Sequence, residues 1–234
     1  MAIPKIDNGW CFYTVDTIKS LEVGPKGLTC PLGDKRGKVN ALLFGDSFAG
    51  HNEPFWDALG KRDGIRVNAV STNWCFPSLH DAYNGKEKGR AYQQCQIDRR
   101  HFADHAGDYD VVILAADFHD VAKQDHIPFL SARYSGGDYD ISRATAIADR
   151  RVQEAHATIR QRTERYPNVM VFSRRAMHAV DGKASRTMAN GVPFSADGSH
   201  IGIDGSLAAA QAFMTSAEYV DFAKRLHALE TVAD

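Results

Sequence analysis

Two short segments, far apart in the chain, carry the residue types of a serine nucleophile and its base. Gly45-Asp46-Ser47 follows an apolar run, and Asp197 and His200 stand three positions apart near the C-terminal end. A serine needs an adjacent base, because its own pKa is far too high for attack on a carbonyl at neutral pH. A carboxylate placed just before a histidine can hold the imidazole through Nδ1 and leave Nε2 for the serine. Together the two segments predict acyl-transfer chemistry.

Each segment alone also has an ordinary structural interpretation. Gly-Asp-Ser is a common turn sequence, and the residues from Asp197 to His200 are suited to capping a helix that begins near Asp204. The catalytic interpretation depends on finding both segments in one chain. One segment follows the first predicted strand, and the other precedes the C-terminal helices.

Apolar runs and helical patterns alternate along the chain and must position these residues. Four runs predict strands, at 39–44, 65–70, 110–115 (a central strand) and 169–172. Five patterns predict helices, at 52–61, 91–106, 142–166, 205–215 and 217–229. This alternation implies βαβ units and a mostly parallel sheet with helices on both faces. Ligands of such a sheet bind beyond the carboxyl ends of its strands, where Ser47 is expected.

The domain organisation follows from the same pattern. Residues 1–37 have no sustained periodicity and predict an irregular N-terminal extension, whereas residues 38–234 predict one α/β domain.

The 28 Lys and Arg residues balance 29 Asp and Glu residues, so no field of one sign points to nucleic acid as a partner. No run of about 18 apolar residues predicts a membrane span. The N-terminus lacks a secretory pattern. It therefore predicts a cytoplasmic protein, unless the chain is a domain excised from a longer one.

The cysteines favour the second alternative. Cys11, Cys30, Cys75 and Cys95 form two local pairs, and the sequential pairing closes the shortest loops of the three possible connectivities. A disulfide across such a loop contributes roughly 3 kcal/mol in the chain-entropy model. Disulfides persist outside the reducing cytosol, so they predict a periplasmic or extracellular location. Four unpaired thiols are the alternative.

No metal or other cofactor is expected. The chain has no C-x-x-C motif, which argues against a zinc ribbon. His101 and His105 are four residues apart on a predicted helix, a spacing that is compatible with a shared metal. However, Asp98 and Asp104 can simply pair with them, and no glutamate follows His101 as in metalloproteases.

Several motifs resemble a known family. The blocks Leu42-Leu-Phe-Gly-Asp-Ser-Phe-Ala49 and Asp197-Gly-Ser-His200 are similar to the first and last signatures of SGNH (GDSL-type) hydrolases. A closer resemblance is to the extracytoplasmic SGNH domains fused behind acyltransferase-3 membrane domains, which O-acylate bacterial surface glycans. The features that carry it are Cys30-Pro-Leu-Gly, Asn73-Trp-Cys-Phe-Pro, Cys95 and Val111-Val-Ile-Leu-Ala-Ala. The resemblance extends over about residues 10–215.

The resemblance implies a fold, a site and a function. It implies a three-layer α/β/α, flavodoxin-like SGNH fold with the triad Ser47, Asp197 and His200. The implied activity is O-acyl transfer, with acetyl as the expected group, to lipopolysaccharide O-antigen, exopolysaccharide or peptidoglycan. The implied partners are a glycan acceptor, an acyl donor and an upstream membrane acyltransferase domain that tethers the chain outside the cytoplasm. A carbohydrate acetyl esterase and a catalytically degenerate glycan-binding module are the alternatives.

The oxyanion hole departs from the pattern of the family. Typical members have a glycine in the second block and an asparagine in a Gly-x-Asn third block, but here these regions read Ser71-Thr-Asn-Trp and Ala115-Ala-Asp-Phe. Asn73 is the candidate side-chain donor, and Trp74 beside it is the candidate for stacking on a sugar ring. Asp46 is a further candidate contact at this site.

Overall fold

The computed structural model describes residues 2–116, 154, 157–172, 188–189, 192–193 and 200–230. The chain divides into two units, of which one contains residues 2–117 and 219–234 and the other contains residues 118–218. Each unit is described by itself.

The first unit contains a four-stranded sheet. Its strands are β1 (Pro31–Gly33), β2 (Val39–Gly45), β3 (Ile65–Ser71) and β4 (Val111–Ala115), in the order β1-β3-β2-β4. The last three are parallel, and β1 is antiparallel to β3. All of β2 except Asn40 is buried, as expected for a parallel strand covered on both faces. The sequence-based expectation of an α/β fold with a mostly parallel sheet is therefore confirmed.

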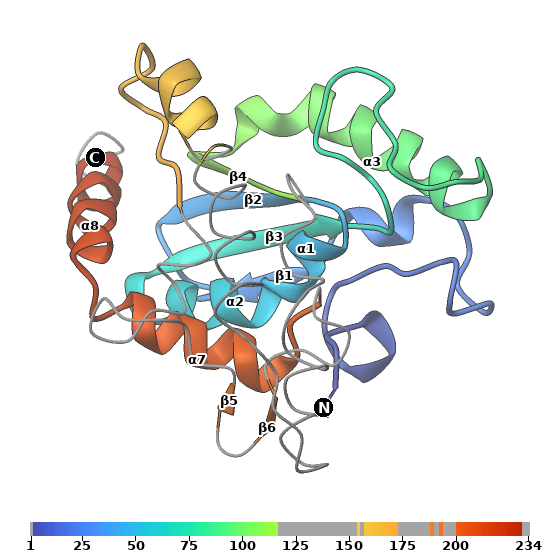
Figure 1. Ribbon diagram of the computed structural model, residues 1–234, viewed down its shortest axis with the longest axis horizontal. Coiled ribbons are helices and arrows are strands. Elements are labelled where there is room, and N and C mark those ends of the chain that lie inside the picture. The colour runs from blue at the N-terminus through green and yellow to red at the C-terminus, as the bar shows by residue number, and fades with distance from the viewer. Residues whose placement is uncertain are drawn as a thin grey trace. The chain divides into compact units, whose positions relative to one another are not determined.

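Helices cover both faces of this sheet. They are α1 (Ser47–His51) and α2 (Glu53–Asp63) on one face and α3 (Arg90–His105) on the other (Figure 1). Alternate residues of a strand point to opposite faces, so Leu42 and Phe44 share the α3 face. The ring of Phe44 stacks on Phe102 of α3 with 4.5 Å between centroids. The three layers that the family resemblance implies are present in this unit.

Shorter elements and the C-terminal helices complete the description. The 3-10 helices are η1 (Ile6–Asn8), η2 (Pro25–Leu28) and η3 (Ala106–Asp108). A small hairpin, β5 (Met188–Ala189) and β6 (Val192–Pro193), contacts α7 (Ile203–Phe213) within the second unit. In α8 (Ala217–Glu230), the Tyr219 hydroxyl donates to Asp63 of α2 at 2.9 Å, and Phe222 contacts Trp56.

The N-terminal segment is more ordered than its sequence predicts. The expectation of an irregular extension over residues 1–37 is wrong at β1, where the Ala69 backbone N–H also donates to the Cys30 carbonyl at 3.0 Å. Phe12, Tyr13 and Val15 are buried, so the segment adds to the core of the same unit as the sheet. A strand of three residues is too short to show a period of two, which is why the pattern missed it.

Two other strand predictions also need correction. The apolar run at 169–172 forms no strand; the Val169 N–H instead donates to the Tyr166 carbonyl at 3.1 Å, in a turn after the helical residues 157–163. Val169 is exposed and residues 170–172 are only partly buried, so the apolar character of this run does not reflect a buried strand. The predicted central strand, β4, pairs only with β2 among the described residues. Of the predicted helix 142–166, residues 157–163 are helical and 164–166 are not, whereas residues 142–153, 155 and 156 lie outside the described residues.

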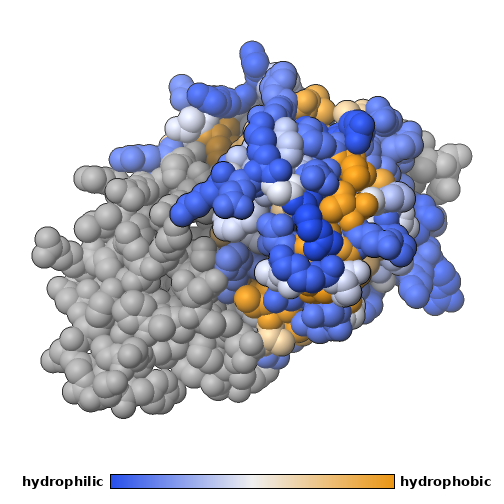
Figure 2. Space-filling view, turned by 90° about the vertical axis from the view of Figure 1, so that its right-hand side faces the viewer, coloured by the Kyte–Doolittle hydropathy of each residue, from blue (hydrophilic) through white to orange (hydrophobic). Residues whose placement is uncertain are grey.

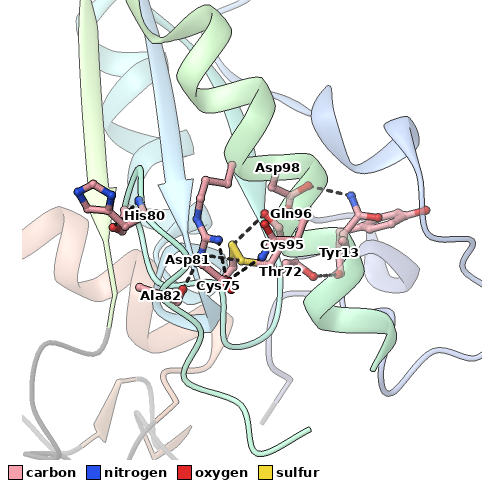
Figure 3. The surroundings of a disulfide bond; sticks show 12 residues. Tyr13, Thr72, Cys75, His80, Asp81, Ala82, Cys95, Gln96 and Asp98 are labelled. Atoms are coloured by element: carbon pink, nitrogen blue, oxygen red, sulfur yellow. Dashed lines mark hydrogen bonds and ion pairs between the residues drawn. A yellow bond between two sulfur atoms is a disulfide. The ribbon is translucent and has the colours of Figure 1, made fainter. Parts of the chain in front are cut away.

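Both disulfides have the sequential pairing. Cys11 is bonded to Cys30 and Cys75 to Cys95, and the described residues include no free cysteine. The second disulfide joins the loop after β3 to α3, beside the segment that contains Asp81 and Ala82 (Figure 3). Both of its cysteines are fully buried.

We expect loss of the Cys75–Cys95 disulfide, in a Cys75→Ser/Cys95→Ser variant, to lower the free energy of unfolding by about 3 kcal/mol or more. The sulfur of Cys95 also contacts an Arg99 guanidinium nitrogen at 3.3 Å, and that contact adds to the entropic loss. The matched control is Cys11→Ser/Cys30→Ser, which opens a loop of nearly equal length (separations of 19 and 20). Urea unfolding measures both, and a smaller loss at Cys75–Cys95 would contradict the expectation.

The surface shown in Figure 2 is mostly hydrophilic, with small separate apolar patches among its described residues. None of the described helices combines the length and the apolar character that a membrane span requires.

Candidate active site

A tight turn places Ser47 at the carboxyl end of the inner strand β2. Gly45, the last residue of β2, lies between Ser71 of β3 and Ala115 of β4 in the parallel register. A Cβ atom at Gly45 would lie 1.8 Å from the Ala115 carbonyl oxygen, so only glycine fits between the strands. Ser47 begins α1 two residues later and is partly exposed.

Asp46 fixes the start of this helix. It is the N-cap residue, and its Oδ1 accepts a hydrogen bond from the Phe48 backbone N–H at 2.9 Å. The side chain of Asp46 is buried, so this contact is sheltered from water. Asp46 therefore positions the backbone around Ser47, and the Phe48 amide is already engaged in the cap.

Asn73 and Trp74 reach the same edge from β3. The Thr72 N–H donates to the Gly45 carbonyl at 3.3 Å, so the chain leaves β3 directly beside the serine turn. The Oδ1 atom of Asn73 is buried and has no hydrogen-bond partner among the described residues. Trp74 has a φ of 62° and is 48% exposed. A bulky residue in this left-handed region is strained by roughly 1–2 kcal/mol.

The loop that carries Trp74 is closed by backbone and side-chain contacts. The Trp74 carbonyl accepts hydrogen bonds from the Phe76 and Asn84 N–H groups, both at 3.0 Å. Arg99 of α3 is buried, and its guanidinium donates to the Ala82 carbonyl at 2.5 Å. With the neighbouring disulfide, these contacts hold the loop against α3 (Figure 3).

Glu53 is a buried acid at this edge that the sequence interpretation missed. Its Oε2 accepts hydrogen bonds from the Cys11 and Phe12 N–H groups at 2.6 and 3.1 Å, and its Oε1 contacts the Ser71 hydroxyl at 2.9 Å. Burial raises the pKa of Glu53 to about 8, although these hydrogen bonds oppose the rise. Glu53 thus ties the N-terminal segment to the end of β3.

No sequence signal identifies this role. A glutamate in the first turn of a helix normally lies in solvent, where it interacts favourably with the helix dipole. Only the buried Pro-Phe-Trp that follows Glu53 hints at an apolar setting.

His200 lies in the second unit, just before α7. It is partly exposed, and the buried Ile201 separates it from Gly202, which is the N-cap residue of α7. The capping alternative is therefore not supported at His200, because another residue occupies the cap position. Asp197, its predicted partner, lies outside the described residues, as does Asp117.

The described residues offer no cluster of three or more His, Cys, Asp or Glu side chains that could hold a metal ion. His101 and His105 contact each other, with 4.7 Å between ring centroids. Burial is the main cause that lowers the pKa of His101, and the neighbouring His105 adds to it. His105 Nδ1 is 2.9 Å from an Asp108 carboxylate oxygen, which gives the ring an ordinary surface partner.

Comparison with known proteins identifies the family. No curated protein and no solved structure gives a significant match. The model of a family described as "SGNH domain (fused to AT3 domains)" matches residues 11–143, which is more than half of the chain. This span includes the serine turn, the Asn73-Trp74 loop and all four cysteines. The chain therefore belongs to the family of SGNH domains that are fused to AT3 domains.

Proposed function

We propose that this domain is a serine-dependent O-acyltransferase that modifies a bacterial surface glycan, with acetyl as the group transferred. The observation that carries the proposal is the placement of Ser47. It follows a glycine-only turn at the end of an inner parallel strand, in a domain of a family fused to AT3 domains. Asp197 and His200 are the proposed remainder of the triad.

The proposed reaction has two half-steps. In the first, Ser47 Oγ attacks the acyl carbonyl of the donor while its proton passes to Nε2 of His200 and then to the leaving group. In the second, a glycan hydroxyl attacks the acyl-serine, gives its proton to His200, and leaves as the ester while Ser47 recovers its hydroxyl. Asp197 orients the imidazole and stabilises its charged form.

The oxyanion of each tetrahedral intermediate needs donors near Ser47. The Phe48 amide is bonded to Asp46 and is therefore an unsuitable donor. We assign the role to the Ser47 amide and the Asn73 side chain, which extends from the neighbouring strand end. In this assignment Nδ2 of Asn73 is the donor to the oxyanion, whereas Oδ1 of the same amide is a buried acceptor without a hydrogen-bond partner among the described residues.

The proposed setting is outside the cytoplasm. Two disulfides tie the loops of the first unit, and such bonds persist in an oxidising compartment. The AT3 fusion recorded for the family favours a membrane partner that supplies the acyl donor. In that arrangement the domain receives the acyl group at the membrane and passes it to a glycan.

A carbohydrate acetyl esterase is the second candidate, because it uses the same triad and differs only in accepting water. A degenerate binding module is disfavoured by the intact turn around Ser47.

We expect the wild-type protein, incubated with an aryl acetate and maltotetraose or chitotetraose, to form acetylated tetrasaccharide. Mass spectrometry detects the product, and Ser47→Ala is expected to form none. Acetate release that depends on Ser47, with no acetylated sugar, would favour the esterase. Absence of both reactions would leave only the binding module.

A further inference from the structure

Trp74 stands out among the described residues of the serine edge. It is 48% exposed and is the only non-glycine residue with a positive φ in the described part of the chain. Glycine or asparagine adopts this backbone conformation at a much lower steric cost than tryptophan. Stability alone therefore favours glycine or asparagine at position 74. An exposed tryptophan in this strained conformation indicates a role in binding.

The backbone of Trp74 is held in place from two sides. Its carbonyl accepts the N–H groups of Phe76 and Asn84, and the next residue, Cys75, is bonded to Cys95 of α3 (Figure 3). A ring carried by a fixed backbone loses little conformational freedom when a ligand covers it. Such pre-organisation favours affinity, and tryptophan supplies a large rigid contact surface.

The position of Trp74 relates it to the reaction. Ser71 ends β3 opposite Gly45, and Trp74 follows three residues later in the turn beside Ser47. Asn73, immediately before it, has a buried Oδ1 atom without a hydrogen-bond partner among the described residues. An exposed aromatic ring and an unsatisfied amide are thus adjacent in sequence at the edge that carries the nucleophile.

We infer that Trp74 is the platform on which a pyranose ring of the acceptor glycan stacks, with Oδ1 of Asn73 accepting a hydrogen bond from one of its hydroxyls. The C–H face of a pyranose is apolar and packs on an indole, while the hydroxyls at its rim form hydrogen bonds. The inference rests on the proposed function, which requires an acceptor glycan at Ser47. It names the subsite that would hold this glycan.

The test measures binding of maltotetraose and chitotetraose to the Ser47→Ala protein by calorimetry, with acyclic sorbitol as the negative probe. At least one tetrasaccharide is expected to bind, and adding Trp74→Asn is expected to weaken that binding at least about tenfold. Asparagine tolerates the left-handed conformation, so the loop should keep its shape. Trp74→Phe is expected to retain affinity within about threefold.

Leu79→Ala is the matched control, because Leu79 is an apolar residue on the same loop and is 66% exposed. It should leave the affinity unchanged. Equal affinities of the Trp74→Asn and parent proteins, or no binding of either tetrasaccharide, would overturn the inference. Binding that depends on Trp74 in a protein without Ser47-dependent acyl chemistry would reject the proposed function and retain Trp74 as a glycan-binding platform. Ser47-dependent acyl transfer in a protein whose glycan binding does not depend on Trp74 would reject the inference and retain the proposed function.

Discussion

Replacing Ser47 with alanine is expected to lower aryl acetate hydrolysis by about 10⁴-fold or more. The reason is that the variant has no nucleophile, and the acyl-serine cannot form. Ser20→Ala is the matched control, because Ser20 is exposed and is not part of the proposed triad. Steady-state release of the aryl alcohol gives kcat/KM, and full activity in Ser47→Ala would reject the proposed nucleophile.

The same assay tests whether His200 works with Ser47. Residues that act as one catalytic unit are grossly non-additive, so His200→Ala should cost nearly as much as Ser47→Ala. The double variant should then be no slower than either single variant. If the two losses multiply instead, the residues act independently and the triad is wrong. Asp197→Asn extends the series, because the amide can stabilise the wrong tautomer of the imidazole.

The sequence predicted the inner strands of the sheet closely because their signal is local. β2 and β3 extend only one residue beyond the predicted ranges 39–44 and 65–70, because an apolar run marks the buried strand β2 and an alternation of apolar and polar residues marks the start of β3. The segments whose secondary structure was predicted wrongly depend on partners that are distant in the sequence. β1 exists because three residues pair with β3, and the apolar run at 169–172 has no strand partner among the described residues. Neither outcome is encoded in the local pattern.

Of the candidate site, the serine turn was predictable from the sequence, whereas the conformation of Trp74 and the burial of Glu53 were not. The turn around Ser47 follows from Gly-Asp-Ser after a strand, and the structure explains the glycine through its contact with Ala115. The conformation of Trp74 was not predictable, because tryptophan rarely adopts a positive φ and only the surrounding loop imposes it. Glu53 was missed because its burial depends on Cys11 and Phe12, some forty residues earlier.

The second large effect is expected at Glu53, whose replacement by alanine should lower the free energy of unfolding by about 3 kcal/mol or more. Three buried groups then lose their hydrogen-bond partner, namely the Cys11 and Phe12 amides and the Ser71 hydroxyl. Each buried unsatisfied group costs about 1–3 kcal/mol. The melting temperature should fall by roughly 6 °C or more. Glu22→Ala is the control, because the side chain of that glutamate is exposed and pairs with Lys26 at the surface.

The Glu53→Gln variant keeps the size of the side chain and its hydrogen-bonding groups but removes its titratable carboxyl. Its oxygen can accept both amides, and its Nε2 can donate to the Ser71 hydroxyl, so Glu53→Gln should fold nearly as stably as wild type at low pH. Burial raises the folded-state pKa of Glu53 from 4.5 to about 8, so between these values the folded protein holds a proton that the unfolded chain has released.

The unfolding free energy of wild type should therefore fall by about 1.4 kcal/mol per pH unit, relative to Glu53→Gln, as pH rises through this window. Asp98, whose pKa burial raises to about 7, adds a decline of the same sign in both proteins and cancels in the difference. Chemical denaturation of the two proteins at several pH values measures that difference. A difference that does not change with pH would show that Glu53 is ionised in the folded protein, whereas the expected decline would show that a neutral carboxyl joins the N-terminal segment to the serine edge.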